Sequence, residues 1–185
     1  NAVDISESTG SGRSSTHPLQ VWCVHWEFMS PTGNSDIHEA LADAMSSRPY
    51  THRQDVDTGI TAVITVEEDM RFLRSTLRSV LTQNVLPGVV IIADATGRTS
   101  SRITTSFEVI PSPSGPVMEV PQSKHVTIHI VSAKGARSFG DAVSRALDRA
   151  DLDDAPRALW LLHDDSRPSD ASCLERLLEA WRNTP

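Results

Sequence analysis

Four short and almost entirely apolar runs, each followed by a polar turn, constrain the fold of this chain more than any other feature of its sequence. They lie at residues 60–66, 89–93, 126–131 and 158–162. Runs of this length and composition are typical of strands that are buried on both faces, as in a parallel sheet covered by helices. The sequence therefore predicts an α/β fold built on a mostly parallel sheet.

Apolar residues at helical spacing fill the intervals between these runs. They predict one helix at 70–83, a second at 139–150 and a third around 174–181. Strands that alternate with helices give right-handed crossovers, with helices on both faces of the sheet. Residues 98–124 interrupt the alternation, and the prolines there favour a loop.

The first part of the chain has a different organisation. In order, it predicts a flexible Ser-, Gly- and Thr-rich start at 1–17, a strand at 19–28, an amphipathic helix at 37–45 and a polar linker at 46–58. We therefore divide the chain into an N-terminal strand-helix extension, 1–58, and a domain, 59–185.

The charge balance, the cysteines and the lengths of the apolar runs limit the partners and the cellular compartment that we expect. The formal net charge is −7, whereas binding to nucleic acid needs a basic patch, so we expect no nucleic acid partner. Cys23 and Cys173 form no C-x-x-C pair and indicate a reducing compartment. No run approaches the ~18 apolar residues that a membrane-spanning helix needs. We expect a cytoplasmic protein, or one on the cytoplasmic face of a membrane that attaches through segments outside these residues.

Acidic residues follow three of the four predicted strands, where a parallel sheet presents its ligand-binding edge. They are Glu67, Glu68 and Asp69 after the first strand, Asp94 after the second, and Asp164 and Asp165 after the fourth. Carboxylates that converge on one edge repel each other unless a cation joins them, and Mg²⁺ or Mn²⁺ takes carboxylate and phosphate oxygens together. The pattern indicates a divalent metal that holds a diphosphate, with Lys134 or Arg137 after the third strand supplying further positive charge.

Each acidic group also has an ordinary structural explanation. Glu67 to Asp69 would stabilise the first turn of a helix, Asp94 would form a turn, and Asp164 with Asp165 would start the turn before the last helix. Their recurrence at successive strand ends favours a shared site.

The sequence has no G-x-x-x-x-G-K-[ST] motif and no G-x-G-x-x-G after the first strand, which argues against a nucleoside triphosphatase and a dinucleotide fold.

Three longer segments carry a more specific pattern. They read TLRSVLTQNVLPGVVIIADATG at 76–97, VSAKGARSFGDAVSRAL at 131–147 and LWLLHDDSRPSDASCLERLL at 159–178. With the opening strand and its acidic turn, their order resembles family-2 glycosyltransferases, particularly the catalytic domains of large actinobacterial cell-envelope enzymes. The resemblance implies a GT-A (Rossmann-like) fold, of which 59–185 would be the nucleotide-sugar-binding part, incomplete at its C-terminal end.

The resemblance also implies an activity. Such enzymes bind a nucleotide-diphosphate sugar with Mn²⁺ or Mg²⁺ and, in the inverting case, transfer the sugar to an acceptor, here expected to be a cell-envelope glycan or glycolipid. The catalytic base would lie beyond Pro185, so we expect residues 1–185 alone to be inactive.

Site residues follow from the same resemblance, position by position. Asp165 matches the second, metal-binding carboxylate of the D-x-D motif, and His163 takes the place of the first. The other positions that match the nucleotide-sugar site are Thr65, Val66, Glu67, Asp94, Lys134, Arg137, Gly140 and Asp164. Of these, Thr65 to Glu67 would hold the base and ribose, and Asp94 would contact the nucleobase.

Alternatives stay open at this point. His163 in place of a carboxylate, and Thr96 to Thr99 without the second acidic residue of the family, favour a non-catalytic GT-A domain that binds or regulates. A nucleotidyltransferase would need a Gly-rich, basic loop where Glu67 and Glu68 stand. An α/β domain with acidic loops would bind no nucleotide at all, so metal-dependent nucleotide binding separates it from the others.

Overall fold

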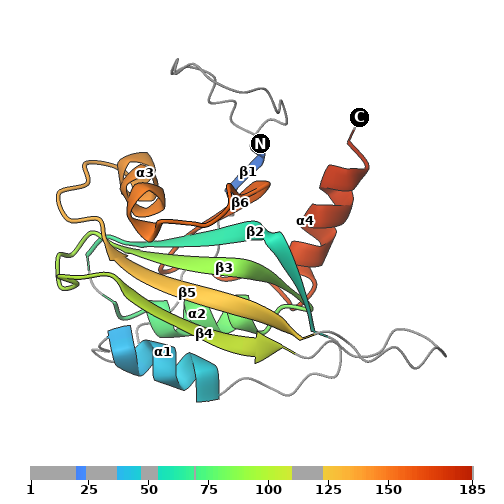
Figure 1. The fold of residues 1–185 in the computed structure, drawn as a ribbon, viewed down its shortest axis with the longest axis horizontal. Helices are drawn as coiled ribbons and strands as arrows, with labels where there is room; N and C mark the ends of the chain where they lie inside the picture. Colours follow the sequence, from blue (N-terminus) through green and yellow to red (C-terminus); the bar gives the residue numbers. More distant parts are fainter. Residues whose placement is uncertain (1–19, 24–36, 47–53, 69, 110–122, 185) are drawn as a thin grey trace.

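A six-stranded sheet organises the part of the chain that the structure describes (Figure 1). The structure is a computed structural model, and it describes residues 20–23, 37–46, 54–68, 70–109 and 123–184. The strands lie in the order β1-β6-β2-β3-β5-β4, and neighbours are parallel except that β4 runs antiparallel to β5. The predicted α/β class with a mostly parallel sheet is confirmed, and the finer assignment to the GT-A fold stays a prediction.

The four predicted strands form the centre of this sheet. They are β2 (Asp55–Val66), β3 (Val85–Asp94), β5 (Lys124–Ser132) and β6 (Ala158–His163). Successive residues enter opposite core layers, as Val63 and Ile64 of β2 do, and both side chains have no solvent exposure. Burial on both faces is the reason why these runs are apolar throughout.

Helices cover both faces of the sheet, as predicted (Figure 1). They are α2 (Leu73–Leu81), α3 (Phe139–Ala150) and α4 (Cys173–Arg182). Leu73 of α2 and Leu174 of α4 share the core layer of Ile64, whereas Ala142 and Ala146 of α3 belong to the opposite layer. Within the described ranges, no helix is long and apolar enough to cross a membrane.

Strand β4 (Ile103–Val109) corrects the expectation of a loop over 98–124. It pairs antiparallel with β5, and its residues alternate between half-buried and exposed, with Ile103 and Phe107 packed against the core. The prolines that favoured a loop all lie at 111–121, after this strand and outside the described residues. They therefore did not oppose a strand at 103–109.

Two elements of the predicted N-terminal extension belong to the same layers. They are β1 (Gln20–Cys23), within the strand predicted at 19–28, and α1 (Ile37–Ser46), the predicted helix. β1 pairs in parallel with β6, and α1 packs against α2, where Arg74 forms ion pairs with Glu39 and Asp43. The flexible start predicted at 1–17 and the remainder of the predicted strand, residues 19 and 24–28, lie outside the described residues.

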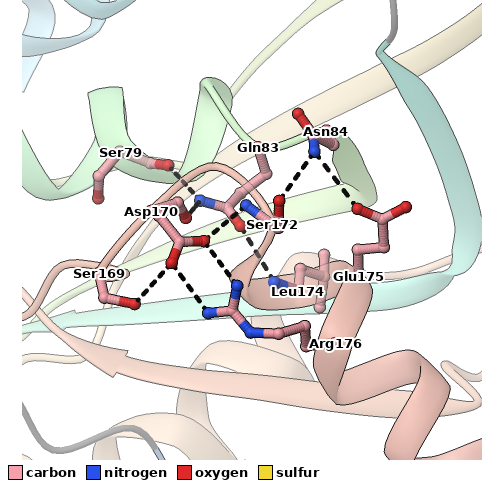
Figure 2. Close-up of polar contacts among 9 residues, drawn as sticks. All are labelled: Ser79, Gln83, Asn84, Ser169, Asp170, Ser172, Leu174, Glu175 and Arg176. Carbon is pink, nitrogen blue, oxygen red and sulfur yellow. Dashed lines mark hydrogen bonds and ion pairs between the residues drawn. The ribbon is translucent and has the colours of Figure 1, made fainter.

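The polar linker predicted at 46–58 is wrong in its last residues, because β2 begins at Asp55. The side-chain amide of Gln54 donates to the main-chain carbonyl of Gln83, and the N–H of Asp55 donates to the carbonyl of Asn84. These bonds tie the start of β2 to the segment that follows α2, and Figure 2 shows the side chain of Gln83 in this segment bonded in turn to Leu174 at the start of α4. The predicted boundary between extension and domain therefore falls inside a strand.

The chain reverses its direction across the sheet between β2 and β6. From β2 it moves through β3 to β5, and α3 then carries it back to β6 on the other side of β2. In open parallel sheets, ligands bind outside the carboxyl ends of the strands at such a switch point. The fold therefore directs attention to the turns that follow β2 and β6.

Candidate functional site

The carboxyl ends of four parallel strands meet at one edge of the sheet. The register places Thr65 of β2 beside His163 of β6, and Val66 of β2 beside Asp94 of β3. Asp94 in turn lies beside Ser132 of β5. The sheet thus brings together the strand ends that the sequence analysis singled out.

The turns after β2 and β6 enclose a pocket of about 240 Å³, which we call the acidic pocket. It is lined by Glu67, Glu68, Arg71, Phe72, His163, Asp164 and Asp165. Four of the seven are predicted site residues, which come from strand ends almost a hundred positions apart. Sequence reasoning misses Arg71 and Phe72, whose only signal is their place directly after the acidic turn. The guanidinium carbon of Arg71 lies 5.6 Å from the centroid of the Phe72 ring, a cation–π distance.

A second pocket, of about 290 Å³, lies where α3 begins, and we call it the α3 pocket. It is lined by Glu67, Glu68, Ala95, Ala136, Arg137, Ser138 and Ala142. Glu67 and Glu68 line both pockets, so the two adjoin at the turn after β2. Arg137, a predicted site residue, is the one cationic side chain among the residues that line the α3 pocket, together with Glu67 and Glu68.

The start of α3 is fixed by reciprocal capping. The side chain of Ser138 accepts a hydrogen bond from the N–H of Asp141, and the carboxylate of Asp141 accepts one from the N–H of Arg137, at 3.2 and 2.8 Å. This arrangement satisfies the N–H of Asp141, which the first turn leaves free, and the N–H of Arg137 just before the N-cap. Gly140, the predicted site glycine in this turn, is exposed, and a Cβ on it would meet nothing within 4 Å.

Lys134 lines neither pocket and lies over the loop that follows β3. A Cβ added to Gly97 would come within 3.0 Å of Cδ of Lys134, and Gly97 itself has a φ of 81°. Glycine adopts such a positive φ without strain, so Gly97 serves both the turn and the close approach of the lysine stem. Lys134, also a predicted site residue, therefore packs its aliphatic stem over Gly97 and is not part of the lining of either pocket.

Asp94 is fully buried, and its carboxylate is occupied by its own loop. One oxygen accepts hydrogen bonds from the N–H and the hydroxyl of Thr96, and the other accepts one from the N–H of Thr99, at 2.9, 2.5 and 2.6 Å. Burial on its own would raise the pKa of Asp94, but the hydrogen bonds from Thr96 and Thr99 outweigh it and lower the pKa below its usual value. The side chain predicted to contact a nucleobase thus lies beneath the loop, in neither pocket.

Thr65 and Val66 are also fully buried and line neither pocket. Their main-chain carbonyls accept hydrogen bonds from the N–H groups of Asp164 and Ala95, at 3.0 and 2.9 Å. Both residues therefore hold the turns that form the site. The hydroxyl of Thr65 lies 3.5 Å from Nδ1 of His163.

His163 is held on both sides by neighbours from other elements. Its ring packs against that of Phe139 at the start of α3, with the centroids 4.4 Å apart and the planes tilted by 34°. Thr65 lies against Nδ1. The imidazole is thus oriented before any ligand binds, and it lines the acidic pocket.

Whether a divalent metal fits this site depends on where its oxygen ligands come from. Among the residues that the structure describes, no three His, Cys, Asp or Glu side chains converge closely enough to hold a metal by themselves. Mg²⁺ in nucleotide sites is commonly held by one or two carboxylates together with substrate phosphates and water. Asp164, Asp165 and His163 line the acidic pocket and offer the oxygen and nitrogen donors that such a mode would use.

Comparisons with protein-family models, with curated proteins and with solved structures give no significant match. The resemblance to family-2 glycosyltransferases therefore stays a prediction. The candidate site rests on the geometry of the carboxyl edge.

Proposed function

We propose that this chain binds a nucleotide-diphosphate sugar at the carboxyl edge of its sheet, as the donor-binding part of a family-2-type glycosyltransferase. The observation that carries the proposal is the pair of adjoining pockets at the switch point between β2 and β6. Glu67 and Glu68 line both pockets, Asp164 and Asp165 add carboxylates to one, and Arg137 adds a cation at a helix start to the other. A metal-bound diphosphate would use both kinds of group.

The charges of the two pockets support this assignment. In the acidic pocket, Asp164 and Asp165 would share Mn²⁺ or Mg²⁺ with the diphosphate, and His163 would add a nitrogen ligand or a hydrogen bond. In the α3 pocket, Arg137 would contact phosphate oxygens, helped by the positive end of the α3 dipole. An acidic chain can bind an anionic ligand in this way because the metal neutralises both partners locally.

The proposed reaction is an inverting transfer. The acceptor hydroxyl would form a bond to the anomeric carbon while the bond from that carbon to the diphosphate oxygen breaks, and a base would take the hydroxyl proton. A bound metal would supply Lewis-acid stabilisation of the departing diphosphate. We assign no described residue as the base.

A non-catalytic nucleotide-binding domain is the second candidate function. The saturated carboxylate of Asp94 and the imidazole of His163 at the D-x-D position favour it, because both differ from what the resemblance leads us to expect. This candidate shares the binding site and lacks turnover. Sugar transfer, assayed in a protein that contains these residues together with an acceptor-binding part, separates the two.

Calorimetry tests the binding step. UDP, dTDP and GDP are titrated into the chain with Mn²⁺ and then with a chelator, for the wild type and for Asp165→Ala. We expect one nucleotide to bind in a metal-dependent manner, and Asp165→Ala to weaken that binding at least tenfold, about 1.4 kcal/mol.

Asp154→Ala is the matched control, since Asp154 is exposed and lies in the loop between α3 and β6, near the opposite edge of the sheet. It should leave nucleotide affinity within about twofold of the wild-type value, well under 1 kcal/mol. Equal affinities of Asp165→Ala and Asp154→Ala would remove the metal role of Asp165. A wild type that binds none of the three nucleotides would overturn the proposed function.

A further inference from the structure

Thr76 is a buried polar residue of α2 whose hydroxyl reaches out of the helix. It has no solvent exposure, and its Oγ1 donates to the main-chain carbonyl of Asp164, 2.5 Å away. Ser79, on the next turn of the helix, donates instead to the carbonyl of Thr76. Hydroxyls within helices usually bond to their own helix in this way. The contact of Thr76 therefore links two segments that lie 88 positions apart in the chain.

This bond completes a clamp on the turn that follows β6. The N–H of Asp164 donates to the carbonyl of Thr65 at the end of β2, and the carbonyl of Asp164 accepts from Thr76 on α2. Inside the turn, the N–H of Ser166 donates to the carbonyl of His163 at 3.0 Å. The main chain is thus fixed to a strand on one side and to a helix on the other.

The clamp leaves the side chains of the turn at the pocket while it holds their main chain. His163, Asp164 and Asp165 all line the acidic pocket. Metal and phosphate sites require their ligands within about 0.5 Å of the productive geometry, and buried neighbours usually provide that precision. Thr76 itself is buried and lines neither pocket, so it would act only through the turn.

We propose that Thr76 is a positioning residue, which fixes the turn at 163–166 so that Asp164 and Asp165 lie ready for a metal-bound diphosphate. The ligand in this statement rests on the proposed function. The positioning of the turn does not, since it depends only on the hydrogen bonds of the free protein.

The test compares Thr76→Val, which keeps the shape and removes the hydroxyl, with Thr76→Ser, which keeps the hydroxyl. Ser79→Ala is the matched control, because it removes a hydroxyl that bonds only to α2 itself. Two quantities are measured for each variant. The first is the hydrogen-exchange rate of the Asp164 and Ser166 amides without ligand, and the second is the affinity for UDP, dTDP and GDP with Mn²⁺.

We expect Thr76→Val to speed the exchange of both amides and to weaken metal-dependent nucleotide binding, each by about tenfold, which is the scale of one buried hydrogen bond. Thr76→Ser should stay within about threefold of the wild type in both measurements. Amides of β3 should exchange at the wild-type rate in both variants, since the effect is local. Rescue by serine separates the hydroxyl from the packing of the methyl group.

The outcomes are distinguishable. If Thr76→Val matches Ser79→Ala in exchange and in affinity, the positioning role is overturned and the proposed function stands. If the wild type binds no nucleotide, the proposed function fails, and the amide exchange alone decides the positioning role. If Thr76→Val does not fold, Thr76→Ala replaces it: exchange of the Asp164 and Ser166 amides about tenfold faster than in Thr76→Ser supports the role, and equal exchange in the two variants overturns it.

Discussion

An aspartate at the end of β3 and another in the turn after β6 lie at the same edge of the sheet, and the two side chains have opposite surroundings. Asp94 is fully buried and accepts three hydrogen bonds from its own loop. Asp165 is exposed and lines the acidic pocket. The carboxylate after β3 stabilises its loop, whereas the carboxylate after β6 is free to meet a ligand.

The difference shows two separate roles for carboxylates at strand ends of a parallel sheet: one stabilises a loop, and the other is available to a ligand. A carboxylate that is saturated by main-chain and hydroxyl donors would have to release them before it could bind a base or a metal, and burial makes that release costly. An exposed carboxylate in a pocket needs no such rearrangement. Ligand contact at this edge is therefore expected mainly on the β2 and β6 side.

The largest expected effect comes from removing the buried carboxylate. Asp94→Ala leaves the N–H groups of Thr96 and Thr99 without their acceptor in a partly buried loop, so we expect the free energy of unfolding to fall by about 3 kcal/mol. Urea unfolding measures this change. A loss below about 1 kcal/mol would mean that the loop finds other partners and that the contrast between the two aspartates is weak.

The reverse pattern is expected at the other strand end. Asp165→Ala should change the free energy of unfolding by less than about 0.5 kcal/mol, because the side chain is exposed. It should nevertheless weaken metal-dependent nucleotide binding by at least about 1.4 kcal/mol, tenfold in affinity. Unfolding and calorimetry on the same protein sample check both parts. A variant that loses stability and retains binding would invert the comparison.

The pH dependence of stability sharpens the role of Asp94. Hydrogen bonds from Thr96 and Thr99 hold its folded-state pKa below the ordinary value of 3.8, although burial opposes them. The unfolded chain therefore binds more protons in acid, and the stabilisation is present above about pH 4 and lost as pH falls through the folded-state pKa. Urea unfolding between pH 6 and pH 3 should show a shallower acid limb for Asp94→Asn than for the wild type. Parallel curves would contradict the assignment.

The smallest effect is expected at Gly140, in the first turn of α3. A Cβ there meets nothing within 4 Å, so Gly140→Ala should stabilise the protein by about 0.5 kcal/mol through helix propensity alone. Thermal unfolding measures this gain. Since the protein itself has room for the methyl group, any accompanying loss of nucleotide affinity would report contact between Gly140 and the ligand. A loss of stability would contradict the open geometry.

Much of the framework could be predicted from local patterns. The apolar runs that became β2, β3, β5 and β6 and the helical spacing of α2, α3 and α4 are properties of consecutive residues, and burial on both faces demands them. Strand β4 escaped prediction because its half-buried pattern is weak and prolines follow it closely. The pocket residues His163, Asp164 and Asp165 were found because strand ends of a parallel sheet converge by rule.

Sequence alone determined that acidic turns would gather at one edge of a mostly parallel sheet. Only the tertiary structure decided that the carboxylate of Asp94 is bonded by its own loop, whereas the carboxylates of the turns after β2 and β6 line a pocket. It also decided that Arg71 and Phe72 join the acidic pocket, and that Thr76 holds a turn 88 positions away. The physical reason is that hydrophobic periodicity is encoded locally, whereas the burial and the partners of a polar side chain depend on segments that meet only when the sheet has formed.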